Sequence, residues 1–121
     1  MTEAQKALVE RVKAELSSED ERTWQEFVDH QELGQCQVIA ATIAAAHPEF
    51  TAVVGEVETD QPYQDEDGEE QTQVLHHWVE LDGVPLDFAK GTLRCFREDS
   101  DPYDPEISEP DAYHTGTRKT K

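Results

Sequence analysis

The dipeptide Asp82-Gly83 separates two segments that have the composition of β-strands, and it restricts how the middle of the chain can fold. Val74 to Leu81 is rich in β-branched and aromatic residues, and Val84 to Phe88 follows the dipeptide directly. An Asp-Gly pair between two such runs is the strongest short-range signal of a two-residue hairpin turn. We therefore expect an antiparallel hairpin in which Leu81 lies opposite Val84.

This register assigns the side chains of the hairpin to two faces. Directly opposed residues share a face, and successive residues alternate between faces. His76, Trp78 and Asp87 are therefore predicted on one face, with His76 and Asp87 as diagonal neighbours about 7–8 Å apart at the backbone. The other face is predicted to carry His77 with a row of apolar residues: Val79, Leu81, Val84, Leu86 and Phe88.

Helices are predicted ahead of the hairpin. Thr2 to Gln5 fits a capping box, and apolar residues then recur every fourth position, which predicts a helix from about 3 to 16. Residues 18–21 (Ser-Glu-Asp-Glu) fit a second capping box and predict the start of a second helix. A third helix, from about Cys36 to Ala46, has almost no polar face, which is typical of a buried helix.

The remaining segments complete an α+β arrangement. We expect a strand at 51–57, a long solvated loop at 58–73 and a short strand at 92–96. Residues 1–97 are expected to form a single domain, in which the buried Cys-bearing helix packs on a small antiparallel sheet. Residues 98–121 are acidic and contain several prolines, so we expect an extended or disordered tail.

The chain carries 28 acidic and 10 basic residues, for a formal net charge of −18. Such a field repels the phosphates of nucleic acids and anionic membrane surfaces, so neither is expected as a partner. A protein or peptide substrate is compatible with it, a basic one included. A cytoplasmic location is expected, because no signal peptide or membrane-spanning run is present and two cysteines suggest reduced thiols. The sequence does not indicate an oligomeric state.

Cys36, His76 and Asp87 have the residue types and the chain order of a cysteine-nucleophile triad. Unpaired N–H groups at a helix start and a nearby imidazolium both lower the pKa of a thiol. His76 would accept the thiol proton and return it to the leaving group, and Asp87 would orient the imidazole. The backbone N–H of Cys36 is the first candidate for stabilising an oxyanion, and the side chains of Gln31 and Gln35 are alternative second donors. Trp78 is expected to pack beside the site.

The three residues also fit simpler structural roles. Cys36 alone fits a small core residue, His76 a surface histidine and Asp87 a polar residue at a strand end. The chain as a whole could also be a non-catalytic acidic protein that binds a basic partner by imitating a nucleic-acid backbone, or an inactive scaffold. The histidines and cysteines lack zinc-ligand spacing and there is no glycine-rich phosphate loop, so no metal or cofactor is expected.

Three segments carry a family resemblance. Gly34-Gln35-Cys36, leading into an alanine-rich helix, resembles the nucleophile helix of transglutaminase-like, papain-fold proteins. Residues 76–83 (HHWVELDG) look like the H-x-W-V-E strand of these proteins, and residues 85–92 (PLDFAKGT) are similar to the segment that supplies their carboxylate. Residues 54–57 (VGEV) look like the strand that precedes the histidine. The resemblance covers about residues 34–93 and is closest to small bacterial or phage members.

The resemblance implies a papain-like, transglutaminase-like fold and a thiol-dependent amide hydrolase or acyl-transfer enzyme that works through an acyl-thioester. The superfamily includes thiol proteases, amidases, deamidases, transglutaminases and inactive relatives. The family pattern places the catalytic histidine two residues before the tryptophan, which is His76, the residue that the hairpin register also selects. The chain departs from the pattern at Ala89, where a threonine or serine is usual.

Overall fold

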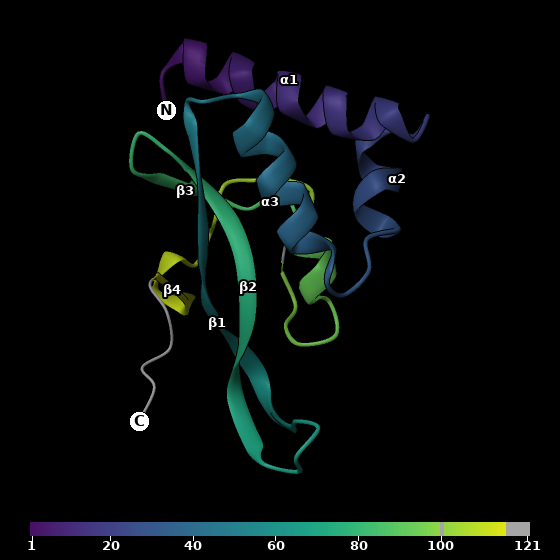
Figure 1. The fold of residues 1–121 in the computed structure, drawn as a ribbon, viewed down its shortest axis with the longest axis vertical. Helices are drawn as coiled ribbons and strands as arrows, with labels where there is room; N and C mark the ends of the chain where they lie inside the picture. The colour runs from purple at the N-terminus through teal and green to yellow at the C-terminus, as the bar shows by residue number, and fades with distance from the viewer. Residues whose placement is uncertain (100, 116–121) are drawn as a thin grey trace.

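The computed structural model describes residues 1–99 and 101–115 and has an α+β fold, with three helices ahead of a curled four-stranded antiparallel sheet (Figure 1). The strands lie in the order β3-β2-β1-β4. Two short 3-10 helices, η1 and η2, follow the third strand. The elements are α1 (Glu3–Glu19), α2 (Trp24–Asp29), α3 (Gln35–Ala46), β1 (Phe50–Gln64), β2 (Glu70–Leu81), β3 (Val84–Leu86), η1 (Lys90–Leu93), η2 (Pro110–Ala112) and β4 (Tyr113–Thr115).

The first two helices begin at capping boxes, one where it was predicted and one elsewhere. Thr2 and Gln5 form the predicted box at the start of α1. The box predicted at 18–21 is wrong, because α1 continues to Glu19 and Ser18 bonds back to a carbonyl of its own helix. Thr23 caps α2 instead and forms a reciprocal box with Glu26.

Helix α3 is buried along one face only, which corrects the expectation of a helix that is buried all round. Gly34 begins it in the left-handed region, with φ of 95°. The sheet covers one side of the helix, while the small side chains on the opposite side are exposed. The buried face is made by Cys36, Ile39, Ala40 and Ile43.

The hairpin between β2 and β3 has the predicted register. Leu81 pairs with Val84 and Val79 pairs with Leu86. Asp82 and Gly83 both have positive φ, 52° and 82°, as a two-residue turn that matches the strand twist requires. These pairs place Val79, Leu81, Val84 and Leu86 on one face, as predicted. Strand β3 ends at Leu86 instead of continuing to Phe88, so the pairs predicted for residues 87–89 do not form.

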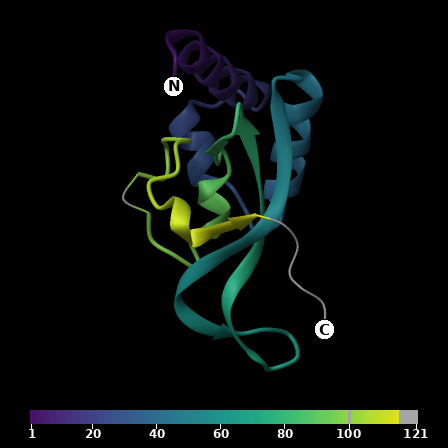
Figure 2. The same cartoon turned by 90° about the vertical axis from the view of Figure 1, so that its left-hand side faces the viewer.

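Residues 58–73 form a β-hairpin rather than the long loop expected from their acidic composition. The ladder between β1 and β2 continues past a register shift between Glu58 and Tyr63, and only residues 65–69 connect the strands. The Tyr63 hydroxyl donates to the carbonyl of Gln73, and its ring packs on Phe96. Figures 1 and 2 show this hairpin projecting well beyond the helices.

The segment after residue 89 also differs from expectation. The strand expected at 92–96 is absent, and its first residues belong to η1. The segment expected to be a tail contains η2 and β4, and β4 pairs with β1. The Lys90 amine is buried and donates to the carbonyls of Asp101 and Glu106, which ties this segment to the domain. The part of the tail at 116–121 lies outside the described residues.

The sheet separates two apolar clusters. The larger cluster lies on the helix side and includes Cys36, Val79 and Leu81. The smaller lies on the opposite face and includes Val57, Trp78 and Leu93, with Tyr113 packed against it. Figure 2 shows α3 and the C-terminal segment on opposite sides of the sheet. Within the described residues, no helix is long and apolar enough to cross a bilayer.

Candidate active site

Cys36 lies in the first turn of α3, at its second residue. N–H groups in the first turn of a helix have no partner inside the helix and carry partial positive charge. The residue is only 7% exposed and contributes to the helix-side cluster. The predicted position of the thiol at a helix start is thus found in the structure.

The sulfur of Cys36 reaches β2 at an unpaired edge. Leu81 and Val84 flank the two-residue turn, so the backbone groups of Leu81, Val79 and His77 point toward β3. Strand β3 ends at Leu86, which pairs with Val79, so no β3 residue remains to pair with His77. The backbone N–H of His77 is instead a hydrogen-bond donor to Cys36 and helps to lower the pKa of the thiol.

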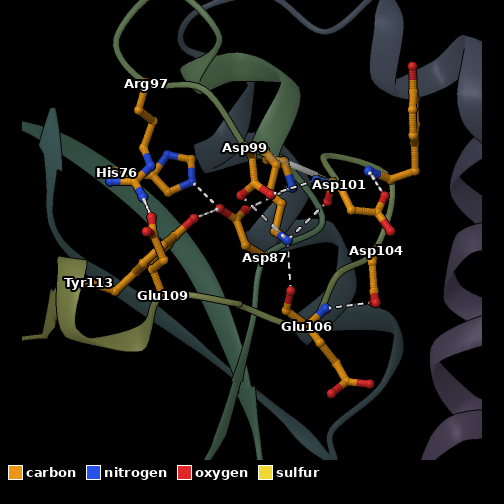
Figure 3. Close-up of polar contacts among 12 residues, drawn as sticks. His76, Asp87, Arg97, Asp99, Asp101, Asp104, Glu106, Glu109 and Tyr113 are labelled. Carbon is orange, nitrogen blue, oxygen red and sulfur yellow. Dashed lines mark hydrogen bonds and ion pairs between the residues drawn. The ribbon is translucent and has the colours of Figure 1, made fainter. Parts of the chain in front are cut away.

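His76 and Asp87 meet on the other side of β2, as expected, although Asp87 lies beyond the end of β3 and not opposite Trp78. Nε2 of His76 lies 2.9 Å from Oδ2 of Asp87, and both residues are 1% exposed (Figure 3). The second ring nitrogen, Nδ1, is buried and has no conventional hydrogen-bond partner among the described residues. His76 and Cys36 nevertheless act on each other's pKa, so the thiol and the imidazole lie close together. With Nε2 bonded to Asp87, Nδ1 is the atom left to exchange a proton with the sulfur.

Asp87 accepts three hydrogen bonds in this buried position. One oxygen accepts from His76 and from the Tyr113 hydroxyl, which lies 2.6 Å away, and the other accepts from the backbone N–H of Ala89 at 2.9 Å. Tyr113 was missed in the sequence, because it lies in the segment expected to be a tail and nothing in its surroundings marks it. The main-chain N–H of Ala89 thus supports the carboxylate without a side-chain hydroxyl at that position.

Aromatic rings enclose the imidazole. Trp78 stacks on His76 with ring centroids 6.1 Å apart, and Tyr113 packs edge-on against both rings. Gly55, which pairs with His76 across the ladder, leaves room for this packing, since a Cβ there would lie 2.7 Å from the Trp78 ring. Trp78 therefore packs beside the site, as the sequence predicted.

The two glutamines considered as oxyanion donors occupy different environments. Gln31 is buried, and its amide nitrogen donates to the carbonyl of Phe88 at 2.9 Å. Gln35 is exposed, and its carbonyl oxygen accepts from the backbone N–H of Glu32, which supports the turn before α3. Gln31 holds the segment that follows Asp87, whereas Gln35 lies directly beside the thiol in sequence.

The charges of the site favour a thiolate and an imidazolium. Burial alone would raise the pKa of Cys36, but the hydrogen bond and charge of His76 lower it below its ordinary value. Burial alone would lower the pKa of His76, but the charge and hydrogen bond of Asp87, with a smaller effect of Cys36, raise it to about 9. Asp87 keeps a low pKa in spite of complete burial, because His76, Tyr113 and the N–H of Ala89 stabilise the carboxylate. Burial and Asp87 raise the pKa of Tyr113, so its hydroxyl stays a donor.

A separate cavity of about 920 Å³ lies beside η1 and is not lined by Cys36, His76 or Asp87. Three basic side chains line it, and each donates to oxygens of the protein itself, so they connect chain segments rather than form a free anion site. These side chains are Lys90, Arg94 and Arg97. Within residues 1–99 and 101–115, no group of three or more His, Cys, Asp or Glu side chains is placed to hold a metal ion.

Comparison of this chain with family models, with curated protein sequences and with solved structures finds no match. The site consists of a buried thiol at a helix start, next to an imidazole whose other ring nitrogen is bonded to a carboxylate, and that carboxylate also accepts from a tyrosine hydroxyl.

Proposed function

We propose that this chain is a thiol-dependent enzyme that hydrolyses an amide or transfers its acyl group, with Cys36, His76 and Asp87 as the reacting triad. The observation that carries the proposal is the contact of Cys36 with His76, whose other ring nitrogen is bonded to buried Asp87. Such a set lowers the pKa of a thiol and orients its base. We also propose that the helix and sheet are a small form of the papain-like, transglutaminase-like fold, supported by the order of the three residues and the elements that carry them.

The reaction begins with attack of the Cys36 thiolate on the carbonyl carbon of the amide. The resulting oxyanion accepts a hydrogen bond from the backbone N–H of Cys36, at the start of α3. The His76 imidazolium then donates its proton to the leaving amine, the C–N bond breaks, and an acyl-thioester remains. Water or a second amine attacks the thioester and gives its proton to His76, and the thiolate is released. Asp87 stabilises the imidazolium throughout and keeps its ring in place.

A second candidate is a non-catalytic acidic protein that binds a basic partner. The observation that favours it is the projecting hairpin, whose segment 58–73 contains seven acidic residues and no Lys, Arg or His. That surface needs no thiolate to act. The enzyme therefore requires an activated thiolate at Cys36, and the acidic binder does not.

The reactivity of the two free cysteines tests the proposal. Cys36 is buried and Cys95 is exposed, so accessibility alone would make Cys95 react faster. We expect iodoacetamide to modify Cys36 faster than Cys95 between pH 6 and pH 8, measured by mass spectrometry of the two peptides, because the thiolate is the nucleophile. His76→Ala is expected to remove this advantage and leave the rate at Cys95 unchanged. Labelling of Cys36 at or below the rate of Cys95 would contradict the proposed enzyme and favour the acidic binder.

A further inference from the structure

The helix layer covers only part of the sheet. Helix α3 packs over Val79 and Leu81, and its N-terminal end reaches β2 at His77 (Figure 1). Beyond that point the same face of the sheet continues without a helix over it. Val54 pairs with His77, and Leu75 lies two residues further along β2 on the same face.

This uncovered part of the sheet exposes apolar side chains. Leu75 is 61% exposed and Val54 is 37% exposed, and the other exposed large apolar residues of the described chain, Met1, Leu33 and Val38, lie outside β1 and β2. Exposed large apolar residues that lie together are informative, because they mark surfaces that bind something. We call Val54, Leu75 and His77 the bare sheet face.

The bare sheet face adjoins the nucleophile. His77 contributes its side chain to this face and its backbone N–H to the Cys36 sulfur. A chain lying on Leu75 and Val54 would therefore pass directly beside the start of α3. Because this face adjoins the proposed nucleophile Cys36, we expect the molecule that binds it to be the substrate.

The acidic residues of the 58–73 hairpin favour a positively charged substrate. Strands β1 and β2 lead from the bare sheet face into segment 58–73, which holds seven acidic residues and no Lys, Arg or His of its own, with Glu58 in contact with the ring of His114 at its start. The chain as a whole carries a net charge of −18, so its field attracts cations to this end of the molecule. The acids are Glu58, Asp60, Asp65, Glu66, Asp67, Glu69 and Glu70.

We propose that the bare sheet face docks the substrate of Cys36, and that this substrate is a polypeptide segment with an apolar side chain beside the reacting carboxamide and lysines or arginines beyond it. The apolar side chain lies on Leu75 and Val54, and the basic residues lie along the acidic hairpin. The proposal rests on the proposed function and adds to it the class of substrate. It also gives the exposed leucine a role that packing does not explain.

The test measures docking without catalysis. The ¹⁵N-labelled Cys36→Ala protein is titrated with four hexapeptides that have a central glutamine, flanked by phenylalanine or by serine and ended by lysines or by glutamates. We expect saturable chemical-shift changes at Val54, Leu75, His77 and the 58–73 hairpin with the phenylalanine–lysine peptide. The two serine peptides are expected to bind at least about tenfold more weakly, the cost of one lost apolar contact. The phenylalanine–glutamate peptide is also expected to bind more weakly, because the acidic hairpin repels its glutamates.

Two variants complete the test. Leu75→Ser is expected to weaken binding of the phenylalanine–lysine peptide about tenfold or more. Val38→Ser changes a residue that is 65% exposed on α3 and faces α1, and is expected to leave binding unchanged. The proposal would be overturned if Leu75→Ser and Val38→Ser weakened binding equally, or if the glutamate peptides bound as tightly as the lysine peptides. It would also be overturned if the chemical-shift changes lay elsewhere in the protein, or if no peptide bound. Shifts at the bare sheet face that depend on protein concentration alone would overturn it as well, since they would indicate a contact between two copies.

Failure here and failure of the proposed function are distinguishable. The titrated protein lacks the thiol, so peptide binding does not depend on reactivity. A fast-reacting Cys36 without peptide docking would overturn only the docking surface. Docking beside an unreactive Cys36 would overturn only the enzyme.

Discussion

Replacing Asp87 by asparagine tests whether the buried carboxylate sets the charge of the site. Asparagine keeps the size of the side chain and removes its charge. In the native protein the charge and hydrogen bond of Asp87 act against burial, which alone would lower the pKa of His76, and raise it from 6.5 to about 9. Without the carboxylate, burial is opposed only by the smaller effect of Cys36, so we expect the pKa of His76 to fall to 6.5 or below.

The size of the effect follows from these two values. At pH 7.5 the imidazolium fraction is about 97% for a pKa of about 9 and about 9% for a pKa of 6.5, a roughly tenfold difference. The pKa difference itself, from 6.5 to about 9, corresponds to about 3 kcal/mol of interaction between the imidazolium and its surroundings. Cys36 loses its cationic partner by the same factor, so alkylation at pH 7.5 is expected to slow about tenfold. Direct repulsion between Asp87 and the thiolate acts in the opposite direction, but it is the smallest of the effects on Cys36.

Two measurements check this. The pKa of His76 is read by NMR titration of its ring, and the thiolate is followed through the pH dependence of iodoacetamide labelling. In the native protein the thiolate–imidazolium pair is expected from the lowered pKa of Cys36 up to about pH 9, where His76 loses its proton. Glu58→Gln is the matched control, because Glu58 contacts the exposed ring of His114 at 2.7 Å. If the folded Asp87→Asn protein keeps a pKa near 9 at His76, the electrostatic account of the site is refuted.

Two further variants examine the surroundings of the triad. Tyr113→Phe removes a hydroxyl that donates to a buried carboxylate, so we expect unfolding in urea to show a loss of about 1.5–3 kcal/mol, and a loss under about 0.5 kcal/mol would contradict the assigned bond. Gly55→Ala places a Cβ 2.2 Å from the carbonyl oxygen of His114 and 2.7 Å from the Trp78 ring, so β4 and the ring must move, at a cost of about 1–3 kcal/mol. The near-ultraviolet circular dichroism of Trp78 should change in Gly55→Ala and stay native in Gly68→Ala, where φ of 81° strains the hairpin tip but nothing lies within 4 Å of the added Cβ. An unchanged Trp78 signal in Gly55→Ala would contradict the close packing of Gly55 against Trp78 and β4.

The parts of the site that the sequence predicted are those that local chemistry determines. An Asp-Gly turn has only a few backbone solutions, and one of them places His76 and Asp87 on the same face. The capping box at Thr2 is similarly local. The turn at 82–83 therefore predicts His76 rather than His77 as the partner of Asp87, although the contact itself forms beyond the end of β3.

The parts that were missed depend on contacts between distant segments. The 58–73 hairpin was expected to be a loop because acidic residues are rare in strands, but its backbone pairing continues and Tyr63 packs on Phe96. Tyr113 reaches Asp87 only because Lys90 and β1 hold the C-terminal segment against the sheet. No local pattern in a proline-containing acidic segment records such contacts.

The early end of β3 is what allows the triad to form. The hairpin could have continued, with Phe88 opposite His77, and the backbone N–H of His77 would then have been used in the ladder. Asp87 instead donates its N–H to the carbonyl of Pro105, which turns the chain away from β2 after Leu86. The freed N–H of His77 is taken by Cys36, whose side chain comes from the helix side, while His76 comes from the opposite face. A thiol and an imidazole on opposite sides of a sheet can meet only around an open edge. The hydrogen bond from Asp87 to Pro105 keeps that edge of β2 open, so it is required for the contact between Cys36 and His76 as well as for the fold.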